Sequence, residues 1–330
     1  MAMRLGMLGM WHSHAQGVVD RVAENPGEFE LVGGWDPEPE IVRARSERWT
    51  KQLPGFRIFD APEKVLAQTL QGVVVEGRVH ENLKYARMAL EAGFPVLLEK
   101  PAGVDLAGHR RLIDLARSKH LHVQMAYLFR SMSAVVELLA RARRGDLGRI
   151  YHFRARLPKD IRDYDRFVEE LKLYRGGIFF EMAGHVIDLM VAILGRPKAI
   201  KPFLGHHGEK PGAFVDNGVV IFEYEHAWGI IEVPILESAP HQRRIEIFGT
   251  RGACIIPHLG SGHLANRSIQ PLEVYQAGKE RWETLELPAA TLQLYDLREL
   301  AACASGKKQP DFGFDHDLAV QEALLAASRM

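Results

Sequence analysis

The chain has 330 residues, of which 47% are hydrophobic and 25% charged, and this composition excludes disorder, collagen and coiled coil as descriptions of the whole chain. Lysine plus arginine and aspartate plus glutamate both number 42, so the balanced charge gives no bulk attraction to nucleic acid or to an anionic membrane. The length predicts about two domains, each large enough to bury its own core.

Cysteine usage and hydropathy bear on the compartment. The two cysteines, Cys254 and Cys303, exclude a disulfide framework and are typical of a reducing cytosol. No run reaches about 18 consecutive apolar residues, so we expect no membrane span. Polar residues from Trp11 to His14 interrupt the apolar N-terminus too early for a signal peptide. We therefore expect a cytoplasmic protein with no membrane partner.

The first half of the chain alternates short apolar strands with helices. Strands are expected at residues 3–9, 29–35, 57–59, 73–75, 95–98 and 122–125, and helices at 12–24, from 36 onward, 62–70, 79–92 and 105–120. Asp36 and Pro37 are expected to begin the second helix, as its N-cap and first residue. This alternation favours right-handed crossovers and a doubly wound parallel sheet.

After about residue 148 the pattern changes to successive β-strands. We expect a strand at 149–157, an irregular charged stretch at 158–175, a helix at 177–194, strands at 218–224, 229–235, 243–248, 253–257, 272–275 and 282–287, and helices at 288–305 and 315–328. Short turns between strands favour an antiparallel or mixed sheet that one helix can cover. The C-terminal helices, the Ala-rich last helix among them, could return to pack on the first domain.

A degraded dinucleotide-binding turn follows the first strand. Gly9 can serve as the first glycine of G-x-G-x-x-G, but Trp11 and His14 stand where the other two belong. A plain strand–turn–helix explains this segment equally well. Asp36, about 27 residues after Gly9, could accept hydrogen bonds from the ribose hydroxyls, which favours NAD over NADP, although it is equally suited to cap a helix.

Glu99, Lys100 and Pro101 make an abrupt charged end to an apolar strand. The carboxyl edge of a parallel sheet is where ligands bind in open α/β folds. A lysine at this edge offers a cation and a hydrogen-bond donor to a hydroxyl or carbonyl oxygen. A surface ion pair is the alternative, and it is less favoured because the preceding strand should be central.

Three polar residues form a stripe along the apolar helix at 177–194. Glu181, His185 and Asp188 fall at i, i+4 and i+7, which is a single helix face. A carboxylate beside an imidazole suits general-base chemistry, because it orients the ring and stabilises its protonated form. The alternative is a buried histidine that its neighbours satisfy.

Together these motifs resemble the glucose–fructose oxidoreductase/inositol dehydrogenase (Gfo/Idh/MocA) family over nearly the whole chain. Further similar segments are residues 90–93, 127–130, 145–150, 216–217 and 245–250. The resemblance implies an N-terminal Rossmann domain over residues 1–126. It also implies a C-terminal α/β domain over 127–330, whose large and mostly antiparallel sheet often forms the oligomer interface in the family.

The resemblance also implies site residues. Lys100 matches the lysine that touches nicotinamide ribose and substrate, His185 the catalytic histidine, and Glu181 the aspartate that supports it. The cofactor positions implied are Gly9, Met10, Trp11, His12, Asp36, Gly77, Arg78, Glu99 and Lys100, and the substrate positions are Tyr127, Arg130, Tyr174 and His185. Three departures affect these sites: the two replaced glycines, Glu181 in place of aspartate, and residues 77–82 in place of a Thr-Pro-Asn-x-x-His turn.

The leading hypothesis is an NAD-dependent dehydrogenase that acts on a sugar, polyol or related hydroxy compound and forms a homo-oligomer. We expect Trp11 and His12 to lie across the cofactor site, although Trp11 could instead be a core residue. We assign no metal ligands, yet a metal-dependent or redox-neutral lyase or hydrolase remains an alternative. His12 and His14 diverge by about 200° on a helix, but from a loop they could share an ion with Glu76 or His80. A binding protein with a lapsed cofactor site is the third possibility.

Overall fold

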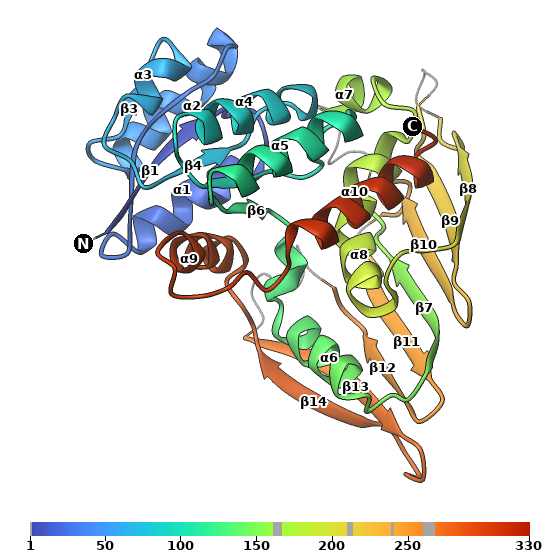
Figure 1. The fold of residues 1–330 in the computed structure, drawn as a ribbon. Coiled ribbons are helices and arrows are strands. Elements are labelled where there is room, and N and C mark those ends of the chain that lie inside the picture. Colours follow the sequence, from blue (N-terminus) through green and yellow to red (C-terminus); the bar gives the residue numbers. More distant parts are fainter. Residues whose placement is uncertain (1, 161–166, 210–213, 239–240, 260–267) are drawn as a thin grey trace. The chain divides into compact units, whose positions relative to one another are not determined.

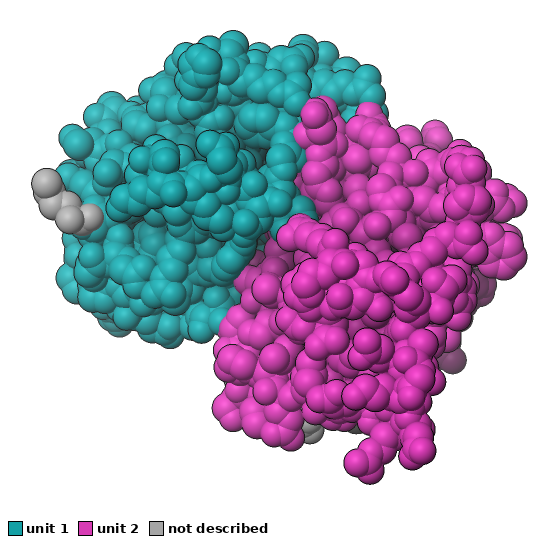
Figure 2. Space-filling view, turned by 60° about the horizontal axis from the view of Figure 1, so that its bottom comes forward, with its two compact units in different colours: residues 1–126, 291–314 teal, residues 127–290, 315–330 magenta. Residues whose placement is uncertain are grey.

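The computed structural model describes residues 2–160, 167–209, 214–238, 241–259 and 268–330 (Figure 1). The chain divides into two compact units, which Figure 2 colours separately. Unit 1 contains residues 1–126 and 291–314, and unit 2 contains residues 127–290 and 315–330. Residues 291–314 lie in unit 1 although the sequence analysis counts them with the C-terminal domain, and C-terminal helices were expected to be able to pack on the first domain.

Unit 1 is built on a six-stranded sheet with the order β3-β2-β1-β4-β5-β6. The strands are β1 (Met3–Leu8), β2 (Phe29–Trp35), β3 (Arg57–Ile58), β4 (Gly72–Val75), β5 (Val96–Leu98) and β6 (Val123–Met125). All neighbouring strands pair in parallel, so their carboxyl ends lie at one edge. The expected doubly wound Rossmann sheet is confirmed, and its strand order reverses between β1 and β4, where such folds bind ligands.

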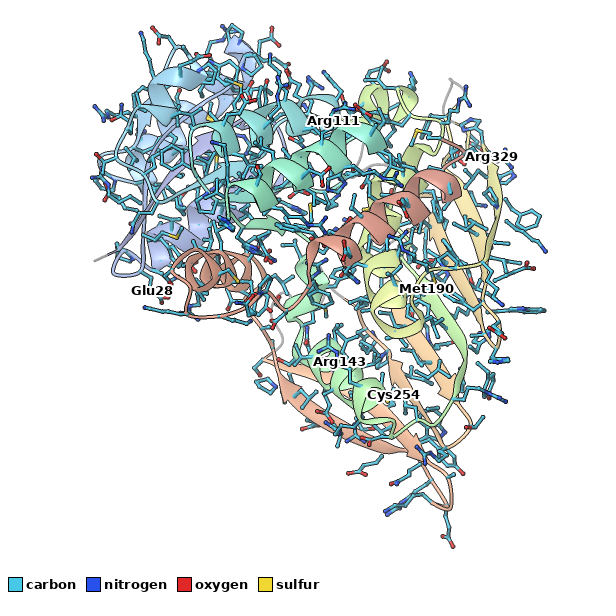
Figure 3. All side chains as sticks on the ribbon, in the orientation of Figure 1. Glu28, Arg111, Arg143, Met190, Cys254 and Arg329 are labelled. Carbon is cyan, nitrogen blue, oxygen red and sulfur yellow. The ribbon has the colours of Figure 1, made fainter. Side chains whose placement is uncertain are left out.

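Helices cover both faces of this sheet (Figure 1). They are α1 (His14–Glu24), α2 (Pro39–Gln52), α3 (Pro62–Leu66), α4 (Val79–Glu91), α5 (Leu106–Ser118) and α9 (Leu292–Ala304). Helix α9 packs against α1, and its Leu297 belongs to the same hydrophobic core as Val18 and Val19 of α1. Its Arg298 pairs with Glu28, labelled in Figure 3, at 2.6 Å. The C-terminal helix that joins unit 1 is therefore α9, whereas α10 belongs to unit 2 apart from its first residue.

The start of α2 corrects a prediction. The helix begins at Pro39 with Glu38 at the N-cap position, and not at Asp36 and Pro37. The carboxylate of Asp36 accepts hydrogen bonds from the backbone amides of Met10, at 2.6 Å, and Glu38, at 2.9 Å. Asp36 is therefore a bridge between the β1 and β2 turns. Asp105, in contrast, caps α5 as expected, by accepting from the amide of Gly108.

Unit 2 contains an eight-stranded sheet with the order β14-β13-β12-β11-β7-β10-β9-β8. The strands are β7 (Ile150–Arg156), β8 (Ala199–Gly205), β9 (Asn217–Glu223), β10 (Trp228–Pro234), β11 (Arg244–Gly249), β12 (Gly252–Ile256), β13 (Ile269–Gln276) and β14 (Glu283–Pro288). Strands β7 and β10 pair in parallel, and the other neighbours pair antiparallel. The mostly antiparallel sheet is confirmed. The sequence analysis missed β8, whose Pro202 is tolerated because β8 is an edge strand.

Helix α8 (Gly177–Leu194) packs on this sheet against β7, β9 and β10. It has a mean hydropathy of 1.8 and is long and apolar enough to cross a membrane, but 78% of it is buried in the structure, as expected of a core helix. The remaining helices are η1 (Leu128–Ser131), α6 (Ser133–Arg144), α7 (Val168–Lys172) and α10 (Phe314–Ala327). Helix α6 was not among the expected elements, although Gly145 follows it at φ 75°, as is typical of a helix C-terminus.

Candidate active site

The turn after β1 and the turn after β4 touch through two glycines. Gly9 has φ 79°, and a Cβ built on it would lie 2.4 Å from both the amide nitrogen and the Cα of Gly77. Neither the backbone conformation nor the space allows a side chain at Gly9. This contact holds together the two turns that were expected to bind a cofactor.

Trp11 and His12 lie directly after this contact. The amide of His12 donates to the carbonyl of Glu76 at 3.0 Å, which extends the connection between the two turns. Trp11 is only partly buried, and the guanidinium of Arg78 lies 4.9 Å from the centre of its ring. Arg78 in turn forms a bidentate ion pair with Glu38. Trp11 is therefore held by a cation–π contact and is not a core residue.

Asp36 lies at the carboxyl end of β2. It is 6% exposed, and burial raises the pKa of its carboxyl despite the amides of Met10 and Glu38. Each carboxylate oxygen has a second lone pair, so Asp36 can still accept from a ribose hydroxyl. Together with the close glycine turn, this geometry fits a dinucleotide.

A buried group of histidines and glutamates occupies the same sheet edge, and we call it the His–Glu cluster. His12 and His14 follow β1, Glu76 follows β4, and Glu99 follows β5. The Nδ1 atom of His12 lies 3.6 Å from Oε2 of Glu76 and 3.6 Å from Oε1 of Glu99. His14 Nδ1 lies 3.0 Å from Glu99 Oε2, and Lys100 Nζ lies 3.9 Å from Glu99 Oε1.

The two glutamates of the His–Glu cluster differ in their electrostatics. Burial and the neighbouring Glu99 raise the pKa of Glu76 to about 7. Burial also disfavours the charge of Glu99, but His12 and His14 outweigh it and lower the pKa of Glu99. Glu76 is thus the carboxyl group that holds a proton more readily. The sequence analysis named it only as a possible metal ligand, although it follows an apolar strand just as Glu99 does.

In unit 2, helix α8 carries His185. Its side chain is 4% exposed, with its ring centre 4.8 Å from that of Phe129 and 6.2 Å from that of Tyr127. Phe129 of η1 and Tyr127, the residue before η1, therefore fix the plane of the imidazole ring. Glu181 lies one turn earlier on α8 and is partly exposed.

Asp188, the third member of the predicted stripe, binds side chains other than His185. We call Asp188, Arg130, His316 and Asp317 the Arg–Asp cluster. Arg130 donates to both carboxylate oxygens of Asp188, at 2.6–3.1 Å, and to Asp317 at 2.7 Å. His316 lies 2.8 Å from Asp188. The sequence analysis missed His316 and Asp317, which lie far from α8 in the chain. Arg130, which was expected to contact substrate, is only 3% exposed. It holds the Arg–Asp cluster together.

Tyr174 was also expected to contact substrate. It is 8% exposed, its hydroxyl donates to Glu170 at 3.0 Å, and its ring packs 5.0 Å from that of Phe180. The nine expected cofactor residues, Lys100 among them, all belong to unit 1. The other expected catalytic and substrate residues belong to unit 2, and they are Tyr127, Arg130, Tyr174, Glu181 and His185.

Comparison with known families assigns both parts of the chain. Residues 3–127 match an oxidoreductase family with an NAD-binding Rossmann fold, and residues 135–255 match the GFO/IDH/MocA C-terminal domain. The chain belongs to the Gfo/Idh/MocA family. It is an oxidoreductase of the NAD-binding type, and the resemblance given by its sequence motifs is confirmed.

Individual relatives are distant. The chain is 35% identical to the uncharacterised oxidoreductase YhhX of Escherichia coli over 127 residues, which cover 38% of this chain and 35% of YhhX. It is 26% identical to inositol 2-dehydrogenase of Rhodococcus erythropolis over 76% of this chain and 69% of that enzyme. It is 28% identical to D-glucoside 3-dehydrogenase of Escherichia coli over 56% of this chain and 52% of that enzyme.

Solved structures share the fold over the full length. An oxidoreductase from Thermotoga maritima superposes with a TM-score of 0.82 at 19% identity, covering 100% of this chain and 96% of its own. A UDP-N-acetylglucosamine 3-dehydrogenase from Acidithiobacillus ferrooxidans superposes with a TM-score of 0.79 at 19% identity, covering 100% and 97%. At this identity the likeness concerns the fold alone.

Proposed function

We propose that this enzyme is an NAD-dependent dehydrogenase that transfers a hydride between nicotinamide and a sugar, polyol or related hydroxy compound. The observation that carries the proposal is the buried Lys100, 2% exposed, at the same sheet edge as the glycine contact between Gly9 and Gly77. An ammonium group at a ligand-binding sheet edge can donate a hydrogen bond to a substrate oxygen. Relatives named for inositol and D-glucoside oxidation support this substrate class.

The cofactor would be held by the turns of unit 1. Gly9 and Gly77 allow the backbone to approach the pyrophosphate, with Met10 beside them, and Asp36 accepts from the adenosine ribose. Trp11 and Arg78 flank the same turn, and His12, Glu99 and Lys100 line the sheet edge beyond it. When bound, NAD supplies the hydride acceptor. A second negative charge next to Asp36 would be repelled, which favours NAD over NADP.

The chain's own residues would move the proton. Lys100 donates a hydrogen bond to the substrate hydroxyl oxygen and stabilises the negative charge that grows on it. His185 accepts the hydroxyl proton on an imidazole nitrogen as the hydride leaves the same carbon, so the alcohol becomes a carbonyl. Glu181 stabilises the imidazolium that forms. Of the remaining candidates, Tyr127 and Tyr174 would line the substrate side. Arg130 positions η1, which carries Phe129 against His185 and directly follows Tyr127.

The enzyme is proposed to assemble through the outer face of the eight-stranded sheet. Large apolar side chains remain exposed on this sheet, including Phe203 at 61% and Trp228 at 60%. Exposed apolar groups of this size are typical of interaction surfaces. The molar mass in solution, measured by light scattering, tests this part of the proposal.

The compartment is proposed to be the cytoplasm. Cys254 is buried and Cys303 is partly buried, and both are free thiols. Burial raises the pKa of both thiols to about 11, so they are poor nucleophiles at neutral pH and persist best under reducing conditions.

The test combines cofactor binding with turnover. We expect NADH to bind in a fluorescence titration, and a panel of inositols, sugars and glucosides to contain a compound that reduces NAD. His185→Ala and Lys100→Met should each lower kcat by about 10²–10⁴, and His185→Ala should leave NADH affinity unchanged. His226→Ala changes an exposed histidine of unit 2 and should keep full activity.

Two results would overturn the proposal. One is a folded protein that binds neither NADH nor NADPH. The other is turnover of the best substrate that persists unchanged in both His185→Ala and Lys100→Met.

A further inference from the structure

The His–Glu cluster brings together several side chains that can serve as metal ligands. One potential ligand atom from each of His12, His14 and Glu99 lies within 4.8 Å of the others. Glu76 extends the group, since its Oε2 lies 3.6 Å from His12 Nδ1. The two imidazole rings meet edge to face with their centres 4.5 Å apart. His12 precedes α1 and His14 is its first residue, so the turn brings together two rings that a regular helix would separate.

Two carboxylate oxygens in this cluster lack a hydrogen-bond donor. Glu76 Oε2 and Glu99 Oε1 are both buried, and neither accepts a hydrogen bond from any residue in the described part of the chain. Both side chains are 1% exposed. Their separations from His12 Nδ1, 3.6 Å each, exceed a normal hydrogen bond. Buried carboxylate oxygens require a compensating donor or cation, and these two point at the same imidazole nitrogen.

We propose that the His–Glu cluster binds a divalent transition-metal ion of the zinc class, with His12, His14 and Glu99 as ligands and Glu76 as the fourth. Two imidazole nitrogens with carboxylate oxygens suit zinc, cobalt or iron(II), whereas magnesium and calcium prefer oxygen ligands alone. Bonds of about 2.0–2.2 Å in a tetrahedron hold neighbouring ligand atoms about 3.3–3.6 Å apart. The distances of 3.6 Å and 3.0 Å in the cluster bracket that spacing.

Charge and existing contacts agree with such an ion. Its two positive charges balance the two carboxylates of Glu76 and Glu99. The lone pair of His12 Nδ1 accepts a long hydrogen bond of 3.2 Å from the amide of His14, and the metal replaces this contact. The site goes beyond the proposed hydride transfer and does not depend on it.

The Arg–Asp cluster of unit 2 provides a comparison within the same molecule. Asp188, His316 and Asp317 also present three ligand atoms within 4.8 Å of one another. Arg130, however, already donates to both aspartates at 2.6–3.1 Å. The guanidinium of Arg130 supplies the positive charge that a metal ion would otherwise provide, so this cluster needs no metal.

The experiment measures metal binding directly. Full-length protein is treated with a chelator, dialysed, and titrated with Zn²⁺ by calorimetry and with Co²⁺ by visible absorption, with Mg²⁺ as a hard-cation probe. We expect one equivalent of Zn²⁺ and of Co²⁺, an intense visible Co²⁺ spectrum typical of tetrahedral coordination, and no Mg²⁺ binding. Glu99→Gln and His14→Ala should each weaken Zn²⁺ binding by about 100-fold or more.

His316→Gln is the matched control, because it changes a histidine of the Arg–Asp cluster and should bind Zn²⁺ as the native protein does. His14 is the most exposed ligand, with 24% of its side chain accessible, so His14→Ala keeps the test valid if Glu99→Gln does not fold. Circular dichroism checks that each variant is folded.

Three outcomes would overturn the site: no Zn²⁺ or Co²⁺ binding below millimolar concentration in the native protein, native affinity in His14→Ala, or an equal loss in His316→Gln. A parallel NADH titration separates the two proposals. Metal binding without NADH or NADPH binding refutes the dehydrogenase alone, and NADH binding without metal binding refutes the metal site alone.

Discussion

Each unit contains a buried cluster of charged side chains. The two clusters differ in whether their carboxylate oxygens have hydrogen-bond donors. In unit 2, Arg130 lies between Asp188 and Asp317 with paired, short hydrogen bonds. In unit 1, Glu76 and Glu99 each keep a buried oxygen without a donor among the described residues. A cluster that satisfies itself is explained by folding, whereas a cluster with unsatisfied carboxylates is expected to serve a ligand.

The electrostatics follow the same division. Burial disfavours the charge of Asp188, but Arg130 and His316 outweigh it and lower the pKa of that carboxyl. Glu76 is equally buried, and burial with the nearby Glu99 raises its pKa to about 7. The difference lies in the partner. An arginine compensates a buried carboxylate at all accessible pH values, whereas a second carboxylate makes its ionisation harder.

The largest effect should come from removing the arginine. Arg130→Met leaves Asp188 and Asp317 buried without a cation, so we expect the free energy of unfolding to fall by about 3–5 kcal/mol. Urea unfolding at neutral pH measures it. Arg144→Met is the control, because Arg144 of α6 is half exposed and pairs at the surface with Asp146, and it should unfold almost as the native protein does. Similar midpoints for both variants would contradict the comparison.

A second prediction contrasts one charge-neutralising change in each cluster. Asp188→Asn removes a charge that Arg130 and His316 both use, and should destabilise the protein by about 3 kcal/mol. Glu76→Gln removes a charge whose Oε2 has no donor, and should change the stability of chelator-treated protein by less than about 1 kcal/mol. Urea unfolding of both variants in one buffer makes the comparison. If Glu76→Gln were as destabilising as Asp188→Asn, Glu76 would be a structural partner.

The third prediction concerns Asp36, a carboxylate of unit 1 that accepts hydrogen bonds from backbone amides. Asp36→Ala should weaken NADH binding by about tenfold, or ~1.4 kcal/mol, and NADPH binding less, because only NADH gains from a carboxylate at the ribose. Fluorescence titrations with both cofactors measure the affinities. Equal losses, or tighter NADPH binding by the native protein, would exclude Asp36 as the selective group. The function of Asp36 would then be only to accept hydrogen bonds from the amides of Met10 and Glu38.

Local patterns predicted the parts of the fold that local physics controls. Helix α8 begins and ends at the expected residues, because an apolar run of this length follows the paired glycines and ends at Gly195. The strands of unit 1 were recognised because parallel strands are buried on both faces and therefore continuously apolar. Helix α6 differs from the expected pattern, although the sequence carries two signals for its C-terminus: a basic last turn and Gly145 directly after it.

The candidate site was predicted only in part. Gly9, Asp36, Glu99 and Lys100 were found from their positions at strand ends, and all four lie at the carboxyl edge of one sheet. The helical stripe was less informative. Spacing placed Asp188 on the face of His185, but its partners Arg130 and His316 come from 58 and 128 residues away in the chain. No pattern within a helix encodes such partners.

The sequence by itself therefore determined the family, the Rossmann sheet, the antiparallel second sheet and the residues that end each strand. Tertiary structure alone decided which of these residues meet. His12, Glu76 and Glu99 come together because β1, β4 and β5 are neighbours in the sheet, and Asp36 bonds to Met10 and Glu38 instead of capping a helix. The spacing of apolar residues along a segment determines the local secondary structure of that segment. The partner of a buried charge depends instead on strand order and crossovers, which bring distant segments to one edge of the sheet.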